Sequence, residues 1–160
     1  MDKATFTQNI IEAQSTLYNV AKSILGLDTD CEDAVQEAIL RAYEKLDSLR
    51  QAEYFKTWIV RILINECYKI QKKRINSLPY EEYFENAPAE EAENYSELYI
   101  AIAKLPVKLR ITIVLHYIEG YSIKEISQAL KIPSGTVKSR LSKGRLMLKQ
   151  DLEDLEVVYA

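Results

Sequence analysis

Basic residues gather in the last third of the chain, and their spacing could serve recognition of nucleic acid. No Asp or Glu occurs between Lys131 and Lys149. Apolar or small residues recur there at helical spacing and predict a core-facing side: Val137, Leu141, Gly144 and Leu148. The remaining positions of that helix are Lys138, Ser139, Ser142, Lys143, Arg145 and Lys149. Lys and Arg neutralise phosphates and donate to guanine, and Ser permits close approach, so this side suits a DNA major groove.

The residues before this helix predict a helix-turn-helix. Ser122 precedes Glu125 by three residues, which is the spacing of a capping box and predicts a helix start. A turn with Pro and Gly follows over 131–135, and a basic helix follows over 136–148. A short helix, a turn and a basic helix are the arrangement of a DNA reader. The alternative, a solvated face on a structural helix, leaves this cap and turn unexplained.

The N-terminal half carries two further charged surfaces. Its acidic cluster comprises Asp28, Asp30, Glu32, Asp33 and Glu37. A basic group follows at Arg61, Lys69, Lys72, Lys73 and Arg74. Phe55 and Trp58 begin the same predicted helix, and aromatic rings beside positive charge can stack on unpaired bases, although such a pair is more often core. Because negative and positive residues lie in separate groups, one surface is expected to contact protein and the other nucleic acid.

Helices must position these residues, because apolar side chains recur every three or four positions and only four Gly and four Pro interrupt the chain. The patterns predict helices over 5–26, 28–46 and 55–73, followed by a second helical region with a break at Pro106. An acidic stretch with two prolines and no Lys or Arg separates the two regions. We therefore expect an all-α protein of two small helical domains, 1–76 and 96–160, joined by a flexible acidic linker, 77–95.

Several functional classes are excluded by what the sequence lacks. Cys31 and Cys67 have no second Cys or His at a ligand spacing, so we expect buried apolar side chains and no zinc site or disulfide. His116 lies in an apolar run and is a core or capping residue in our interpretation, and no glycine-rich phosphate loop occurs. We expect no catalytic residue, metal or cofactor. The absence of a signal segment or an apolar run long enough for a membrane predicts a cytoplasmic protein.

Motifs in both halves resemble the sigma-70 family of RNA polymerase sigma factors. Asp33 to Glu37, and Phe55 to Trp58 with Arg61, Ile62 and Asn65, look like region 2. Region 4 is resembled by Leu105-Pro106, Arg110, Glu119 to Ser122, Glu125-Ile126 and Gly135 to Leu141. A chain with these two regions alone resembles the extracytoplasmic-function (ECF) class. It looks most like the sigma-V-like group of Gram-positive bacteria, whose members answer cell-envelope attack.

The resemblance implies a role for each motif. The residues that would dock on the beta-prime clamp of core RNA polymerase are Asp33, Gln36, Glu37 and Ile39. Those that would capture and melt the minus-ten element are Phe55, Lys56, Trp58, Arg61 and Asn65. The minus-thirty-five element would be read by Thr136, Lys138, Ser139, Arg140, Ser142, Lys143 and Arg145. The implied partners are core polymerase, through its beta-prime clamp and beta flap, promoter DNA, and a membrane-anchored anti-sigma factor.

One rival interpretation is a free-standing transcription regulator, in which the N-terminal domain senses a ligand or dimerises. Such a domain should show a pocket or a symmetric apolar seam, whereas this one shows an acidic helix followed by an aromatic and basic one. A protein that only holds partners together would leave the basic recognition helix unexplained.

Overall fold

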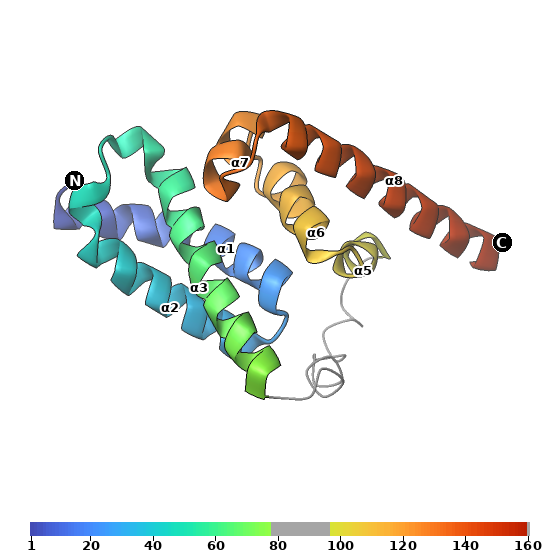
Figure 1. Cartoon of the computed structure of the whole chain (residues 1–160), viewed down its shortest axis with the longest axis horizontal. Helices are drawn as coiled ribbons and strands as arrows, with labels where there is room; N and C mark the ends of the chain where they lie inside the picture. The colour runs from blue at the N-terminus through green and yellow to red at the C-terminus, as the bar shows by residue number, and fades with distance from the viewer. Residues whose placement is uncertain (78–96, 160) are drawn as a thin grey trace. The chain divides into compact units, whose positions relative to one another are not determined.

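The computed structural model describes residues 1–77 and 97–159, and every regular element among them is helical (Figure 1). The predicted all-α class is confirmed. The chain divides into two compact units, 1–87 and 88–160. The predicted linker, 77–95, lies outside the described residues except for Ser77. In the part of the chain that is described, no helix has the length and hydropathy to cross a membrane.

The first unit is a three-helix bundle in which each long helix packs against the other two (Figure 1). Its elements are α1 (Lys3–Leu25), α2 (Asp28–Glu44), η1 (Leu46–Ser48), η2 (Ala52–Tyr54) and α3 (Phe55–Ser77). Asp2 caps α1 by accepting the Thr5 N–H at 2.7 Å, and this hydrogen bond lowers the pKa of its carboxyl. Gly26 ends α1 with a φ of +78°, as predicted from its position.

The core of this bundle joins large side chains of α1 and α3 to small ones of α2. Leu17 and Leu63 are fully buried. The buried side of α2 consists of Cys31, Ala34, Ala38 and Ala42, each with no exposed surface. Cys67 of α3 is buried in the same way, so the prediction that both cysteines are buried apolar side chains is confirmed. Small residues let the backbone of α2 approach its neighbours closely, because no bulky side chain separates the helices.

The second unit is built around its last helix. Its elements are α5 (Glu97–Ala103), α6 (Val107–Ile113), the π-helical turn η4 (Val114–Ile118), α7 (Ile123–Leu130) and α8 (Ser134–Tyr159). Helix α8 packs against α5, α6 and α7 (Figure 1). The predicted capping box is present, with Ser122 Oγ 3.0 Å from the Glu125 amide and Glu125 Oε1 3.0 Å from the Ser122 amide. Helix α7 ends at Lys131, which adopts a left-handed conformation with φ of +55°.

Candidate nucleic-acid interface

Helix α8 has the two sides that the sequence predicts. Val137, Leu141 and Leu148 are at most 9% exposed, and Gly144 is buried between them. The exposed residues include all six that were assigned to the other side, namely Lys138, Ser139, Ser142, Lys143, Arg145 and Lys149. A buried apolar side therefore fixes the orientation of α8, and the basic residues face away from the core.

The exposed residues of α8 fall on distinct sides of the helix at roughly 100° per residue. One stripe follows the spacing i, i+4, i+7 and i+11, and we call it the basic stripe: Lys138, Ser142, Arg145 and Lys149. Ser139 and Lys143 lie next to it, opposite the core. Thr136 and Arg140 are half-buried on the far flank. The structure thus brings Lys138, Ser142 and Arg145 together and separates them from Thr136 and Arg140.

The turn before α8 is held by side-chain and backbone contacts. The hydroxyl of Ser127 donates to the carbonyl of Ile132 at 2.6 Å, and the amide of Ile132 donates back to the Ser127 carbonyl at 3.2 Å. Ile126 of α7 is fully buried, and α7 packs against α8. The same core contains Tyr121, and burial raises the pKa of its phenol. Helix α8 is therefore presented by a fixed scaffold, as a reader of the major groove requires.

Two features beside α8 were not predicted from the sequence. The guanidinium of Arg145 donates through Nη1 to the hydroxyl of Tyr117, 2.9 Å away and 28 residues earlier in the chain. Leu146 is 56% exposed at the centre of the outward face. Tyr117 lies in an apolar stretch of sequence, so it was expected in the core. Leu146 is exposed, whereas Val137, Leu141 and Leu148 of the same helix are buried as predicted.

On α3, the predicted minus-ten residues divide into two groups. Trp58, Arg61 and Asn65 follow the spacing i, i+3 and i+7, which places them on one side of the helix, away from the core. Tyr68, Lys69 and Lys72 continue that side toward the C-terminal end, and all three are exposed. We call this set of six residues the α3 stripe. Tyr68, 41% exposed, is an aromatic residue of this stripe that was not predicted from the sequence.

Phe55 and Lys56 do not join the α3 stripe. Phe55 is only 7% exposed, and its ring lies 6.2 Å from Phe6 and 5.9 Å from Trp58 between centroids. Lys56 is exposed on the side of α3 opposite Trp58. Phe55 is thus a core residue that supports Trp58, and its ring offers no free face for a base.

Two members of the acidic cluster form polar contacts within the helical bundle. Asp30, 1% exposed, receives the Arg74 Nη2 donor at 2.7 Å, which joins the start of α2 to the end of α3. Asp28 accepts from the Tyr18 hydroxyl and from Lys22 Nζ, the latter at 2.6 Å. The hydrogen bond to Asp28 raises the pKa of Tyr18. Asp28 and Asp30 therefore stabilise the bundle, whereas Glu32 and Asp33 are exposed.

The outward side of α2 combines acidic and apolar residues. Asp33 and Gln36 are exposed, and Glu37 and Ile39 are half-buried. Asp33, Gln36 and Glu37 share one face of the helix with Leu40, which is 59% exposed, whereas Ile39 lies on a neighbouring side. Tyr43, one turn further, is 46% exposed. The predicted set missed Leu40 and Tyr43, because a Leu and a Tyr in a helical pattern are ordinarily assigned to the core.

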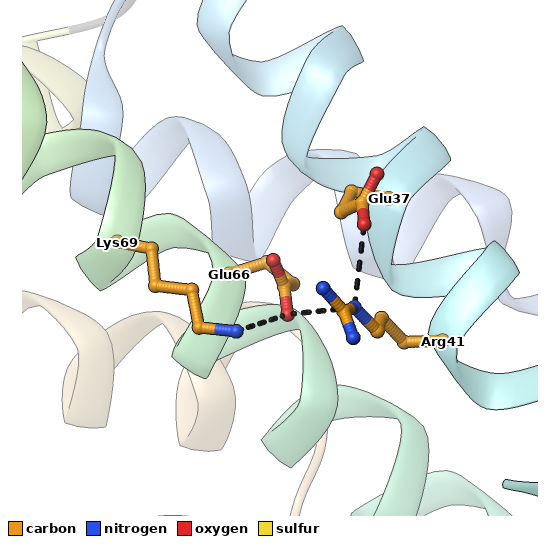
Figure 2. A network of polar contacts seen from close by, with 4 residues as sticks. All are labelled: Glu37, Arg41, Glu66 and Lys69. Carbon is orange, nitrogen blue, oxygen red and sulfur yellow. Dashed lines mark hydrogen bonds and ion pairs between the residues drawn. The ribbon is translucent and has the colours of Figure 1, made fainter.

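A chain of ion pairs links this side of α2 to the α3 stripe (Figure 2). Arg41 Nε lies 3.3 Å from Glu37 Oε1 and 3.8 Å from Glu66 Oε1. Glu66 Oε1 in turn lies 3.1 Å from Lys69 Nζ. Glu66 is a buried carboxylate, 7% exposed, and two cations compensate its charge. Glu66 could not be identified from the sequence pattern, because its partner Arg41 belongs to another helix.

The single histidine of the chain contacts the backbone of the turn that follows η4. His116 is half-buried, and its Nδ1 lies 2.8 Å from the carbonyl oxygen of Tyr121, so the ring joins η4 to the turn before α7. Within residues 1–77 and 97–159, no three His, Cys, Asp or Glu side chains form a group that could hold a metal ion.

Comparisons with known families and structures cover both units. The sigma-70 region 2 model matches residues 10–74, and the sigma-70 region 4 model matches residues 95–148. Two solved structures share the fold. One is the sigma factor RpoE of Bartonella quintana, crystallised with the anti-sigma factor NepR, with a TM-score of 0.76 at 24% identity over 93% of this chain and 97% of that one. The other is CnrH in complex with the cytosolic domain of CnrY, with a TM-score of 0.72 at 25% identity over 96% and 90%.

Curated relatives agree with these matches. The ECF RNA polymerase sigma factor SigW of Bacillus subtilis is 33% identical over 96% of this chain and 92% of its own length. The ECF RNA polymerase sigma-E factor of Haemophilus influenzae is 30% identical over 79% of this chain and 76% of its own. Both regions occur in the order that the motifs indicated, and the chain belongs to the ECF RNA polymerase sigma factors.

Proposed function

We propose that this sigma factor docks on core RNA polymerase through α2 and reads two promoter elements, one with α3 and one with α8. The observation that carries the proposal is the basic stripe, which stands on a rigid helix-turn-helix in the same chain as an acidic and apolar face on α2. A sigma factor directs the polymerase and is not itself an enzyme.

Recognition of the minus-thirty-five element is assigned to α8. Lys138, Ser142 and Arg145 have the reach and donor groups for base edges and phosphates in a major groove. Ser139 and Lys143 contribute from the adjacent side. Thr136 and Arg140, half-buried on the far flank, suit contacts with the DNA backbone at the edge of the groove.

Capture of the minus-ten element is assigned to the α3 stripe. Trp58 supplies a half-buried ring for stacking, Arg61 a charge, and Asn65 hydrogen-bonding groups. Phe55 supports Trp58 from the core. Lys56, on the other side of the helix, suits a phosphate of the flanking DNA.

Docking on the beta-prime clamp is assigned to the outward side of α2. Asp33, Gln36 and Glu37 provide acceptors, and the exposed Leu40 lies among them as an apolar anchor. Ile39 borders this surface. We assign the domains to 1–76 and 96–160 and the linker to 77–95. Because one linker joins the two DNA-binding domains, the two promoter elements must lie at a fixed spacing. The second domain would contact the beta flap.

Regulation is proposed by analogy with the two structural neighbours, of which one was solved with the anti-sigma factor NepR and the other with the cytosolic domain of CnrY. A membrane-anchored anti-sigma factor would hold this protein in the cytoplasm at the membrane surface until envelope attack releases it. Affinity purification of the chain from its own cells should recover one stoichiometric partner with a membrane span. Recovery of core polymerase alone would count against this part of the proposal.

The function is tested by in-vitro transcription from a genomic promoter library with core RNA polymerase, with and without this protein. Transcripts that depend on its addition should share two elements at constant spacing. Leu40→Asp should abolish these transcripts by blocking docking, while Tyr99→Phe, on the outer side of α5, should leave them intact. Operator binding by the protein alone, without such transcripts, would favour the free-standing regulator.

A further inference from the structure

Helices α6 and α8 approach each other closely at Gly144, one residue before Arg145. A Cβ atom on Gly144 would lie 2.8 Å from Cγ1 and 2.9 Å from Cδ1 of Ile113. Ile113, 1% exposed, ends α6. The side chain of Ile113 therefore occupies the space beside the Gly144 backbone, so the end of α6 lies directly against the recognition helix.

At this contact α6 widens into the π-helical turn η4. The amide of Glu119 donates to the carbonyl of Val114, five residues back, at 3.0 Å. The amide of Tyr121 reaches the carbonyl of Leu115 at 2.8 Å. A π-turn contains an extra residue compared with an α-helical turn and redirects the side chains that it carries, and such turns are frequent at functional sites.

The side chain redirected by this turn is that of Tyr117. It is 53% exposed, and its ring contacts His116 edge-on with centroids 4.8 Å apart. Its hydroxyl accepts the Arg145 Nη1 donor at 2.9 Å. The close approach at Gly144 places η4 beside the recognition helix, and the hydrogen bond from Arg145 to Tyr117 joins the two elements.

We infer that Tyr117 is a positioning residue that holds the Arg145 guanidinium for reading one base pair of the minus-thirty-five element, an inference that rests on the proposed function. The guanidinium has five N–H donors, and Tyr117 uses one. The remaining donors are sufficient for a bidentate contact with the O6 and N7 of guanine. A free Arg samples many rotamers, and an anchor on a rigid phenol reduces the entropy lost on binding.

Tyr117 thus contributes to specificity without contacting a base. Its hydroxyl should matter only when Arg145 is present, because that hydroxyl acts through the guanidinium. Its loss should weaken discrimination at one base pair and leave the salt dependence of binding unchanged, since no phosphate contact is removed.

The experiment uses the promoter fragment identified by the transcription assay, with its minus-thirty-five element randomised and bound by holoenzyme reconstituted from core polymerase and the full chain. Sequencing of bound and free DNA gives the base preference at each position. Tyr117→Phe should reduce preference at one position by about fivefold, the equivalent of one ordinary hydrogen bond. Arg145→Ala should remove preference at the same position, and the double variant should match Arg145→Ala. Tyr99→Phe, which removes the hydroxyl of another exposed tyrosine in this unit, should match wild type.

Other outcomes separate the inference from the function on which it rests. Unchanged preference in Tyr117→Phe, a uniform loss of binding to all sequences, or a further loss when Tyr117→Phe is added to Arg145→Ala would each overturn the positioning role. Unchanged preference in Arg145→Ala would instead remove Arg145 from the base-reading set, and the inference with it. Thermal unfolding of each variant shows whether it is folded, and Tyr117→Trp, which retains a ring without an acceptor oxygen, supplies a second variant that should behave as Tyr117→Phe does.

Discussion

The contact between Gly144 and Ile113 predicts that Gly144→Ala destabilises the wild-type chain. The same substitution should stabilise a chain in which Ile113 has been shortened to Ala. Gly144→Ala adds a methyl group that would lie 2.8 Å from Ile113 Cγ1. Overpacking of this kind costs about 1–3 kcal/mol, while Ala in place of a helical Gly gains about 1 kcal/mol. We therefore expect Gly144→Ala to lower the free energy of unfolding of the second unit by about 1 kcal/mol.

Removal of the obstructing atoms should reverse this effect. Ile113→Ala deletes Cγ1 and Cδ1 and, at a fully buried site, costs about 2–5 kcal/mol by itself. In that background the methyl group of Gly144→Ala meets no clash and fills part of the cavity. The substitution should then stabilise the unit by about 1–2 kcal/mol, from helix propensity and about 0.8 kcal/mol per buried carbon. The coupling of about 2–3 kcal/mol exceeds the few tenths expected for independent sites.

The assay must report on the second unit. Trp58, the single Trp, belongs to the first unit, so tryptophan fluorescence does not report on this contact. Hydrogen exchange of the α8 amides in urea, measured by NMR on the full chain, gives the opening free energy of the relevant helix. Gly135→Ala is the matched control, because a Cβ there meets nothing within 4 Å. It should have the same small effect in both backgrounds.

Two results would refute this reasoning. Equal destabilisation by Gly144→Ala with and without Ile113→Ala would show that another atom limits the approach of the helices. Stabilisation of the wild-type chain by Gly144→Ala would show that α6 and α8 separate at little cost, and that Gly144 does not set their distance.

Three further outcomes are expected. Arg74→Ala should cost about 3 kcal/mol in urea unfolding followed by Trp58 fluorescence, and more than Asp30→Asn, because it leaves a carboxylate that is 1% exposed without its cation; equal costs would contradict this. Burial raises the pKa of the Cys67 thiol to about 12, from 9.0, so its contribution to stability is complete below 9.0 and is lost as pH rises toward 12. A urea-unfolding series across that range should therefore fall more steeply for wild type than for Cys67→Ala, and parallel curves would count against it. Ser122→Ala should destabilise α7 by about 1 kcal/mol through loss of the cap, measured as faster amide exchange in α7, with Ser139→Ala as an exposed control that changes little.

Local interactions explain what could be predicted. The stop at Gly26 depends on one residue that adopts positive φ without strain, and the start at Ser122 depends on hydrogen bonds within three residues of sequence. The buried side of α8 follows from apolar spacing alone. Each of these features is decided by neighbours along the chain, so the helices, the all-α class and the helix-turn-helix were predictable.

Contacts between distant segments explain what could not. A sequence pattern could not divide the acidic cluster into Asp28 and Asp30, which are paired within the bundle, and Asp33, which faces outward. The sequence pattern also grouped Phe55 with Trp58, although Phe6 of another helix packs against the Phe55 ring. Charge and aromaticity are properties of a residue, whereas exposure depends on what the other helices cover.

The sequence by itself determined the family, the two helical regions and the basic character of the recognition helix, because residue type and spacing suffice for these. Only the tertiary structure decided which side chains act together. The approach of two helices at Gly144 brings Tyr117 to Arg145 across 28 residues. Packing of α2 on α3 brings Arg41 to Glu66. Such pairings depend on the distance and register between helices, which core packing sets and no local pattern records.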